Sequence, residues 1–428
     1  MTLNSTLDAA SSACKSHAWQ AVGTAFVVAV FGWGTGFYGP PVYLEIVRQS
    51  RGWPIVLISG AVTLHFLVGL ALIPRLAGLY RRFGLSAVTF TGGCVMAAGV
   101  LGWSLARSPW ELYVAALFTG GGWSALGAFA VNAIVAPWFG VKRPLALGIA
   151  FNGGSVGGVI FSPAWVGLIG YVGFATAALI VGAAMLVILG VLSFVTLRRA
   201  PESVEMHHSH AQDASYRARG GAADVPPSRH SAPLYRDFSF LTLCAGMTLA
   251  LFAQTGLVAH LVSVLSPALG TQGAGWAAGL AGVSAVVGRL VVGWRSSSQS
   301  NWRAIASLSV IAQAAGCGVF LFQTNSSSML IVGVVLFGLG VGNAISVPPV
   351  IANLEFSKDA AIRVVAYIVA ISQGAYATAP AIFGFLRQSV GDKAIFGASI
   401  AIECLAVFAY MSGGMAFARK AHSANESM

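Results

Sequence analysis

The chain alternates between long apolar runs and mostly short polar connections. Twelve apolar runs of roughly 20–27 residues can be read along it, and one long polar stretch separates the first six from the last six. A helix rises about 1.5 Å per residue, so runs of this length can cross the hydrocarbon core of a bilayer. We therefore predict transmembrane helices at 19–43, 53–75, 85–107, 110–137, 144–170, 172–197, 238–264, 274–295, 303–323, 328–352, 361–387 and 394–418.

The long polar stretch divides the predicted fold into two halves. It contains the segment Met206–His210 and the pair Pro226-Pro227 within a Ser-, Ala-, Arg- and Gly-rich sequence, a composition typical of disorder. The predicted fold class is an all-α integral membrane protein with twelve transmembrane helices in two pseudo-symmetric six-helix halves. Its predicted parts are a cytoplasmic N-terminal tail (1–18), an N-terminal half (19–197), a basic, disordered cytoplasmic loop (198–237), a C-terminal half (238–418) and a cytoplasmic tail (419–428).

Composition supports a membrane protein before any motif does. Hydrophobic residues make up 57% of the chain, charged residues make up 9%, and the mean hydropathy is +0.78. A soluble domain of this size could not cover its surface with so few charges. The first apolar run is too long for a signal peptide and has no small-residue cleavage site after it, so we expect it to be retained as a helix.

The basic residues are distributed unequally between the two sides of the predicted membrane. Of the 24 Lys and Arg residues, 18 fall on the side of the termini and the central loop, 5 fall on the opposite side, and Arg289 remains within a predicted helix. The positive-inside rule places both termini in the cytoplasm and the chain in the inner or plasma membrane. The net charge of +11 therefore reflects topology, and we expect the lipid bilayer, not nucleic acid, as the partner.

Metal, cofactor and enzyme chemistry find little support in the sequence. The five cysteines are scattered without a CxxC pair, which favours packing roles. The cluster His207–His210 could bind a metal, but its low-complexity surroundings favour a disordered segment. No nucleophile–base pair, phosphate loop or signalling domain is visible, so an enzyme or a solute sensor is disfavoured. We expect no cofactor, no metal and a monomer.

The connection between the second and third predicted helices carries a family resemblance. Residues Gly78–Gly84 read Gly-Leu-Tyr-Arg-Arg-Phe-Gly and are similar to the basic cytoplasmic loop motif of the major facilitator superfamily. Arg81 stands where that motif usually has an acid. The resemblance implies the six-plus-six fold and a cytoplasmic gate that includes Arg81, Arg82 and Gly84.

Four further segments resemble the monocarboxylate transporter and oxalate/formate antiporter group of that superfamily. They are Gly32–Pro41, Pro137–Phe139 followed by Arg143–Ile149, Val258–Val262, and Gly288–Leu290. This resemblance implies a secondary transporter for small carboxylates, in which the eighth-helix arginine, Arg289, binds the carboxylate.

The chemistry of an arginine within a membrane helix also makes Arg289 the leading candidate for substrate binding, independently of the resemblance. An ionisable residue within a membrane helix costs free energy unless it is paired or hydrated, so it marks a functional site by default. The guanidinium fork matches two carboxylate oxygens. The alternative is that Arg289 snorkels to the headgroups. The family resemblance adds that Ala285 stands where some proton-coupled members carry an aspartate, and that Gln373 stands where dicarboxylate antiporters carry a lysine. Both departures point to a monoanion.

Other polar residues complete the predicted site. His260 and His65 are candidates for binding a coupling proton, because imidazole titrates near neutral pH, and structural hydrogen bonding is the alternative for each. Tyr38, Asn132, Asn152, Gln373 and Tyr376, together with His260, are the predicted polar groups of an apolar pocket that would suit a small organic acid. Helix packing is the alternative for the aromatic residues.

The predicted function is secondary active transport of a small organic monoanion by alternating access, with proton symport. Exchange of organic anions and efflux of hydrophobic compounds are the alternatives within transport. Efflux of cations would require an acid near the middle of the first-half helices, and none is present there.

Overall fold

The structure is a computed structural model that describes residues 2–139, 143–197, 234–296, 300–322 and 326–426. These residues form helices and connections without β-strands, which confirms the predicted all-α fold. The first half comprises α1 (Thr2–Gly36), α2 (Gly39–Arg51), α3 (Ile55–Phe83), α4 (Leu85–Leu105), α5 (Pro109–Leu126), α6 (Ala128–Val135), η1 (Ala136–Trp138), α7 (Arg143–Val172) and α8 (Phe174–Val195). The second half comprises η3 (Leu234–Arg236), α10 (Phe238–Arg295), α11 (Trp302–Phe322), α12 (Ser327–Ala344), α13 (Val347–Glu355), α14 (Lys358–Val390) and α15 (Asp392–Glu426).

Helix α10 supplies two of the predicted crossings. It is 58 residues long and would measure about 87 Å if it were straight, far more than the thickness of a bilayer. Gly270 interrupts it with φ 70° and ψ 163°, a backbone conformation that glycine adopts without steric cost. The described residues contain eleven helices that are long and apolar enough to cross a membrane, and the division of α10 brings the crossings to the predicted twelve.

Several helix ends differ from the predicted spans. Helix α3 continues past the predicted end at Arg75 to Phe83, and Gly84, with φ 80°, begins the turn into α4. The predicted tails are largely helical, since α1 begins at Thr2 and α15 ends at Glu426. At these ends the helices continue through polar residues, so they extend beyond the apolar runs from which the spans were predicted. Most of the predicted central loop, including its histidine cluster, lies outside the described residues.

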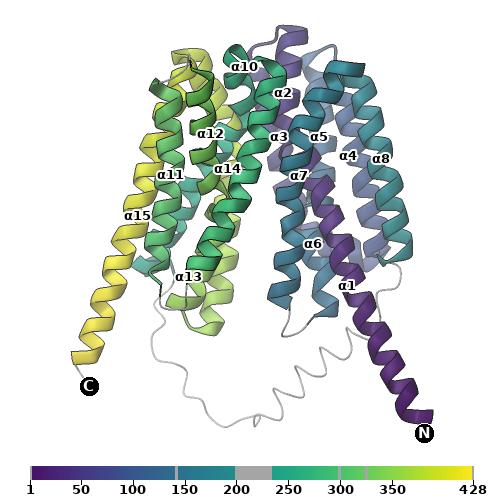
Figure 1. Cartoon of the computed structure of the whole chain (residues 1–428), viewed down its shortest axis with the longest axis vertical. Helices are drawn as coiled ribbons and strands as arrows, with labels where there is room; N and C mark the ends of the chain where they lie inside the picture. Colours follow the sequence, from purple (N-terminus) through teal and green to yellow (C-terminus); the bar gives the residue numbers. More distant parts are fainter. Residues whose placement is uncertain (1, 140–142, 198–233, 297–299, 323–325, 427–428) are drawn as a thin grey trace.

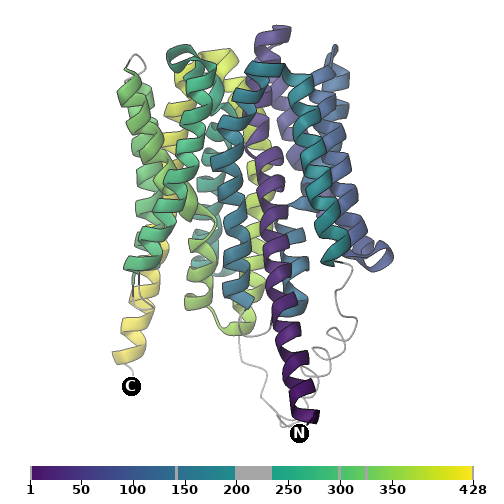
Figure 2. The same cartoon turned by 45° about the vertical axis from the view of Figure 1, so that its right-hand side comes forward.

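The helices form two bundles that stand side by side, with both termini at the same end of the molecule (Figures 1 and 2). We call this the proximal end and the opposite one the distal end. Two hydrogen bonds join the halves near the distal end. Gln49 Nε2 donates to Thr271 Oγ1 over 3.2 Å, and the Val56 amide donates to Gln388 Oε1 over 3.4 Å. In Figure 1 the bundles lean apart toward the termini.

One seam between the halves lies between α7 and α10. Gly275, Gly279 and Gly282 of α10 face Val166, Pro163 and Val159 of α7, and a Cβ atom at Gly275 would lie 2.7 Å from the Val166 side chain. Small residues of this kind allow membrane helices to approach closely. The glycine face of α10 therefore sets how tightly this seam closes.

The second seam lies between α3 and α14. The Ala381 amide donates to Thr63 Oγ1 across the halves over 2.9 Å. Ala381 follows Pro380, which interrupts the hydrogen bonding of α14. A Cβ atom at Gly384, one turn further, would collide with Ser59. This seam thus combines a proline kink with a polar contact from the other half.

Candidate substrate site

Arg289 lies at the contact between the two halves. Its Nε donates to the Gly342 carbonyl of α12 over 3.1 Å, within the second half. Its Nη1 donates to Ser155 Oγ over 3.1 Å and to Asn152 Oδ1 over 3.4 Å, both on α7 of the first half. The guanidinium is therefore held inside the molecule by neutral acceptors, without a carboxylate partner among the described residues.

The guanidinium of Arg289 keeps donors for a ligand. Within the described residues its Nη2 has no hydrogen-bond partner, and the side chain is half-buried. Asn152 is exposed whereas Ser155 is only 8% exposed. A carboxylate that approaches from the exposed side of Asn152 would meet a desolvated, preoriented fork, which is the geometry that favours charge-assisted pairing.

Tyr38 reaches this region from the break between α1 and α2. It precedes Gly39, the first residue of α2, and lies close enough to Arg289 for the two groups to interact electrostatically. Its ring packs against α7 at Gly158, where a Cβ atom would contact the ring at 2.5 Å. The break in the first membrane span thus directs an aromatic hydroxyl toward the arginine.

A small apolar cavity lies beside Tyr38 between the halves. Its lining includes Phe37, Ser162, Leu261 and Phe337, and its volume is about 20 Å³. That volume accommodates roughly one water molecule, so in this conformation the cavity is nearly closed. It supplies apolar surface next to Tyr38, and it would have to widen to hold an organic acid.

The remaining predicted polar residues lie elsewhere. Tyr376 and Gln373 of α14 contact each other, and the Tyr376 ring packs edge-on against Phe66 of α3 at a centroid distance of 6.0 Å. They therefore face the other seam. Asn132 of α6 donates to the Ala128 carbonyl of its own helix over 2.9 Å. Of the predicted set, the structure brings together Arg289, Asn152 and Tyr38.

His65 is fully buried within the first half. Its Nδ1 lies 2.9 Å from Thr119 Oγ1, and its Nε2 lies 2.9 Å from the Gly36 carbonyl. Both ring nitrogens are thus engaged by neutral groups, which matches the structural alternative considered for this histidine. The bond to Gly36 also ties α3 to the end of α1.

His260 belongs to a polar network near the distal end. Its Nε2 lies 3.0 Å from the Pro380 carbonyl, and its Nδ1 lies 3.2 Å from Arg387 Nη1. Arg387 also donates to Ser263 and forms an ion pair with Asp392 at 2.9 Å. A guanidinium must donate, so His260 Nδ1 accepts and the neutral imidazole is the form shown. No hydrogen bond joins His260 to Arg289 among the described residues.

The predicted cytoplasmic gate residues lie at the proximal end of α3. Arg81 and Arg82 occupy its last turn, and the Arg82 guanidinium lies 5.1 Å from the Phe83 ring centroid. Neither arginine forms an ion pair among the described residues. The acid that the resembling motif usually carries is replaced by Arg81 in this loop.

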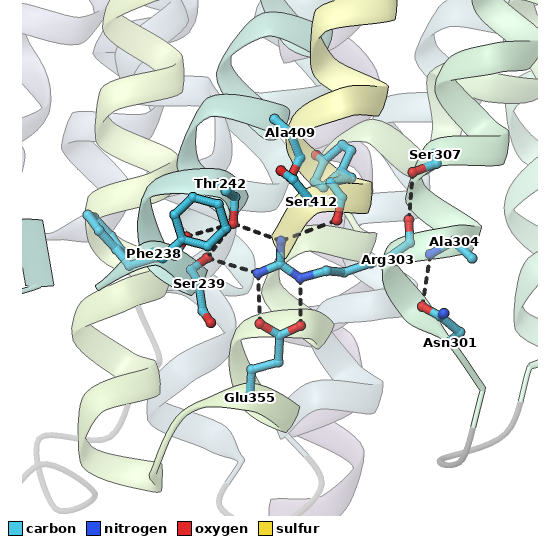
Figure 3. A network of polar contacts seen from close by, with 12 residues as sticks. Phe238, Ser239, Thr242, Asn301, Arg303, Ala304, Ser307, Glu355, Ala409 and Ser412 are labelled. Atoms are coloured by element: carbon cyan, nitrogen blue, oxygen red, sulfur yellow. Dashed lines mark hydrogen bonds and ion pairs between the residues drawn. The ribbon is translucent and has the colours of Figure 1, made fainter. Parts of the chain in front are cut away.

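A charge network that the sequence reading missed holds the proximal end of the second half (Figure 3). Arg303 of α11 is 3% exposed and pairs with Glu355 of α13 through Nε and Nη2, at 2.6 and 2.7 Å. Its remaining donors reach Ser239, Thr242 and the Tyr410 carbonyl. In the sequence Arg303 resembles an ordinary cation at the end of a predicted helix. The signal that could have indicated the ion pair is Glu355, the acid that follows the predicted helix 328–352.

Comparison with known proteins places the chain in a family context. A family model described as the Major Facilitator Superfamily matches residues 24–380. The chain is 29% identical over 337 residues to a gallate transporter of Pseudomonas putida, covering 72% of this chain and 71% of that protein. It is 27% identical over 335 residues to monocarboxylate transporter 12 of Rattus norvegicus, covering 73% and 68%, respectively. It is 26% identical over 371 residues to the aspyridones efflux protein apdF of Emericella nidulans, covering 84% and 68%.

Solved structures show the same fold at low sequence identity. The nucleoside transporter NupG superposes with a TM-score of 0.71 at 11% identity, covering 93% of this chain and 98% of that one. A bacterial homolog of the human lysosomal transporter Spinster, in an inward-facing and unoccupied conformation, superposes with a TM-score of 0.68 at 14% identity, covering 94% and 98%. At such identities the likeness concerns the fold alone.

Proposed function

Because this chain belongs to the Major Facilitator Superfamily, we propose that it is a secondary active transporter that moves a small organic monocarboxylate by alternating access, with proton symport. Membership makes it an integral membrane transporter and not an enzyme, as the sequence predicted. The substrate, the coupling and the site residues are the proposed parts.

The observation that carries the proposal is the position of Arg289. A half-buried guanidinium at the contact between the halves is held by one carbonyl, one hydroxyl and one amide oxygen, which leaves its charge uncompensated. A substrate carboxylate supplies the missing negative charge. None of the described residues that contact Arg289 is a second cation, so a dicarboxylate would bring a charge without a partner. The site thus favours one carboxylate.

The same contacts suggest how binding is linked to the movement of the halves. Arg289 belongs to the second half, whereas Ser155 and Asn152 belong to the first. A carboxylate that takes Nη1 competes with both acceptors and replaces a bond between the halves with a bond to the substrate. Binding energy can then alter the balance between conformations, because the ligand interacts differently with each of them.

The apolar cavity beside Tyr38 suits the organic part of the substrate. Phe37, Leu261 and Phe337 line the cavity next to Tyr38, whose hydroxyl can hydrogen-bond to a substrate oxygen. Relatives named as gallate and monocarboxylate transporters are consistent with small organic anions. We therefore propose an acid with one carboxylate and an apolar or aromatic body.

Proton coupling is assigned to His260. In this conformation Arg387 occupies its Nδ1 at 3.2 Å. A proton on that nitrogen would put two cations in contact, so protonation requires Arg387 to move away. Arg387 is held by Ser263 and Asp392 of the same half, so we propose that a rearrangement within the second half releases His260 for a proton. His65, held by two neutral groups, has no comparable partner that could move.

Orientation follows from the charge bias combined with the fold. Both termini lie at the proximal end (Figure 1), and the excess of Lys and Arg lies on that side. The positive-inside rule makes the proximal end cytoplasmic in the inner or plasma membrane. Export is the second candidate, favoured by the relative that is named as an efflux protein, and it would use the same site in the opposite direction.

The test is uptake by purified protein in proteoliposomes. Labelled aliphatic and aromatic monocarboxylates, a dicarboxylate and an organic cation should be compared with and without an inward proton gradient. The proposal expects monocarboxylate uptake, stimulated by the gradient and lost in Arg289→Gln. Preference for the dicarboxylate or the cation would overturn the substrate assignment. Uptake that ignores the gradient would overturn proton symport.

A further inference from the structure

Glu403 is buried at a seam away from the substrate site. It lies on α15 and is 0% exposed, as are Ser399 one turn earlier and Cys317 on the facing helix α11. Cys317 interacts with both Ser399 and Glu403. Further toward the distal end the seam is closed by Phe320 and Phe396, whose ring centroids are 5.4 Å apart. Glu403 falls eleven residues after the start of α15, about 16 Å along the helix, near the middle of that 24-residue span.

The carboxyl group of Glu403 lacks the partners that the other acids have. Among the described residues, no oxygen or nitrogen donor hydrogen-bonds to either of its oxygens or to Ser399 Oγ, and the Cys317 thiol is the group that interacts with both. Within the described part of the chain the other acids with described side chains are all engaged. Glu45 pairs with Arg48, Glu355 with Arg303 and Asp392 with Arg387, and Glu111 and Asp237 accept from backbone amides.

A polar side chain of the facing helix α11, Gln313, is buried in a similar way. Gln313 is 0% exposed and lies one turn before Cys317, and neither the nitrogen nor the oxygen of its amide group has a hydrogen-bond partner in the described part of the chain. Buried polar groups are nearly always hydrogen-bonded, so a cluster of orphaned atoms needs a physical explanation. An ionised carboxylate would be the least stable occupant of such a place, because it would add an uncompensated charge to an apolar seam.

We propose that Glu403 is a proton-binding site, separate from the substrate site, that holds its proton in this conformation. The neutral acid needs no counter-ion and brings one O–H donor to a cluster that contains free acceptors. The titratable side chain that interacts with Glu403 among the described residues is Cys317. Of the cations on the neighbouring helices, Arg303 is engaged with Glu355, Arg387 with Asp392, and Arg289 with the contacts of the substrate site.

The consequence is that the folded protein should lose stability at alkaline pH. Loss of the proton would leave a bare charge between α11 and α15, and the seam would have to open to hydrate it. Because the folded state retains a proton that the unfolded chain releases, raising the pH favours unfolding. Stability of the second half should therefore fall as the medium becomes alkaline, whatever the substrate is.

Infrared spectroscopy of the full chain in lipid nanodiscs tests the proton directly. Wild type at neutral pH should show a carbonyl stretch of a protonated, non-hydrated carboxyl group that Glu403→Gln removes. Glu111→Gln, which alters an acid that accepts from a backbone amide, should leave this band in place. Absence of the band from wild type, or its persistence in Glu403→Gln, would overturn the proposal.

Thermal unfolding across pH tests the consequence. The midpoint of wild type should fall by on the order of 5 °C between pH 6 and pH 9, and Glu403→Gln should remove most of that fall. Glu403→Leu serves as a second variant in case the amide packs poorly. An equal fall in wild type and in both variants would show that Glu403 is not the responsible group. Neither readout uses a substrate, so each can fail or succeed independently of the proposed transport function.

Discussion

Arg289 Nη1 lies 3.1 Å from Ser155 Oγ, and this contact joins the second half of the molecule to the first. The two residues are 134 positions apart in the chain. If Arg289 binds the substrate anion as proposed, the same guanidinium takes part both in substrate binding and in the contact between the halves.

Arg289→Lys should impair transport far more than expression. An ammonium cannot reproduce the bidentate fork or reach Gly342 and a carboxylate together, so we expect kcat/KM for uptake to fall about 10–100-fold. Initial rates in proteoliposomes, normalised to correctly folded protein, measure this. Wild-type rates in the lysine variant would leave only the snorkelling role for Arg289.

Ser155→Ala should change the balance between binding and movement. Removing the hydroxyl weakens the bond between the halves and frees Arg289 for the substrate, so the half-saturation concentration should decrease about 2–10-fold. The reverse, weaker binding, would indicate that Ser155 contacts the substrate or orients Arg289 for it. Concentration series with wild type and Ser162→Ala provide the comparison, because Ser162 lines the cavity and its hydroxyl has no hydrogen-bond partner among the described residues.

His260→Gln should flatten the pH dependence of uptake while sparing exchange at equal pH on both sides. A glutamine oxygen can still accept from Arg387, but it cannot carry a proton. His65→Gln should leave the pH profile intact, although it can lower stability through the lost bonds to Thr119 and Gly36. Retention of the profile in both variants would move coupling to another group or remove it altogether.

Glu355→Ala should destabilise the second half, because Arg303 would stay buried without its counter-ion. Breaking a buried pair in this way costs about 3–5 kcal/mol. Thermal unfolding of the purified variant should show a lower midpoint, and expression should fall. Arg295→Ala, an exposed cation at the end of α10, is the matched control and should change little. Equal behaviour of the two variants would mean that the network in Figure 3 contributes no stability.

Topology can be tested with reporters. Fusion after Met428 and insertion near Gly220 should both place the reporter in the cytoplasm, because basic residues outnumber those on the other side 18 to 5. Protection of both sites from an impermeant labelling reagent in intact cells measures this. Labelling of either site from outside would contradict the assigned orientation.

The sequence alone was sufficient for the architecture. The length of the apolar runs predicted twelve crossings, and the 58-residue α10 supplies two of them through Gly270. The family resemblance is confirmed by the match over residues 24–380. These properties are local, because a run of apolar residues crosses a bilayer whatever its neighbours are. Arg289 could also be identified from the sequence, because a charged residue within a predicted membrane helix costs free energy unless it is paired or hydrated.

Only the tertiary structure decided which side chains meet. It paired Arg289 with Ser155 and Gly342, His260 with Arg387, and Arg303 with Glu355, and it left Glu403 without a cationic partner among the described residues. The apolar pattern determines the length of a membrane helix. In a chain whose helices are hydrophobic on most faces, it does not determine how each helix is rotated about its own axis. Contacts between helices depend on that rotation and on close approach at residues such as Gly279 and Gly282, so they arise only when the whole bundle is assembled.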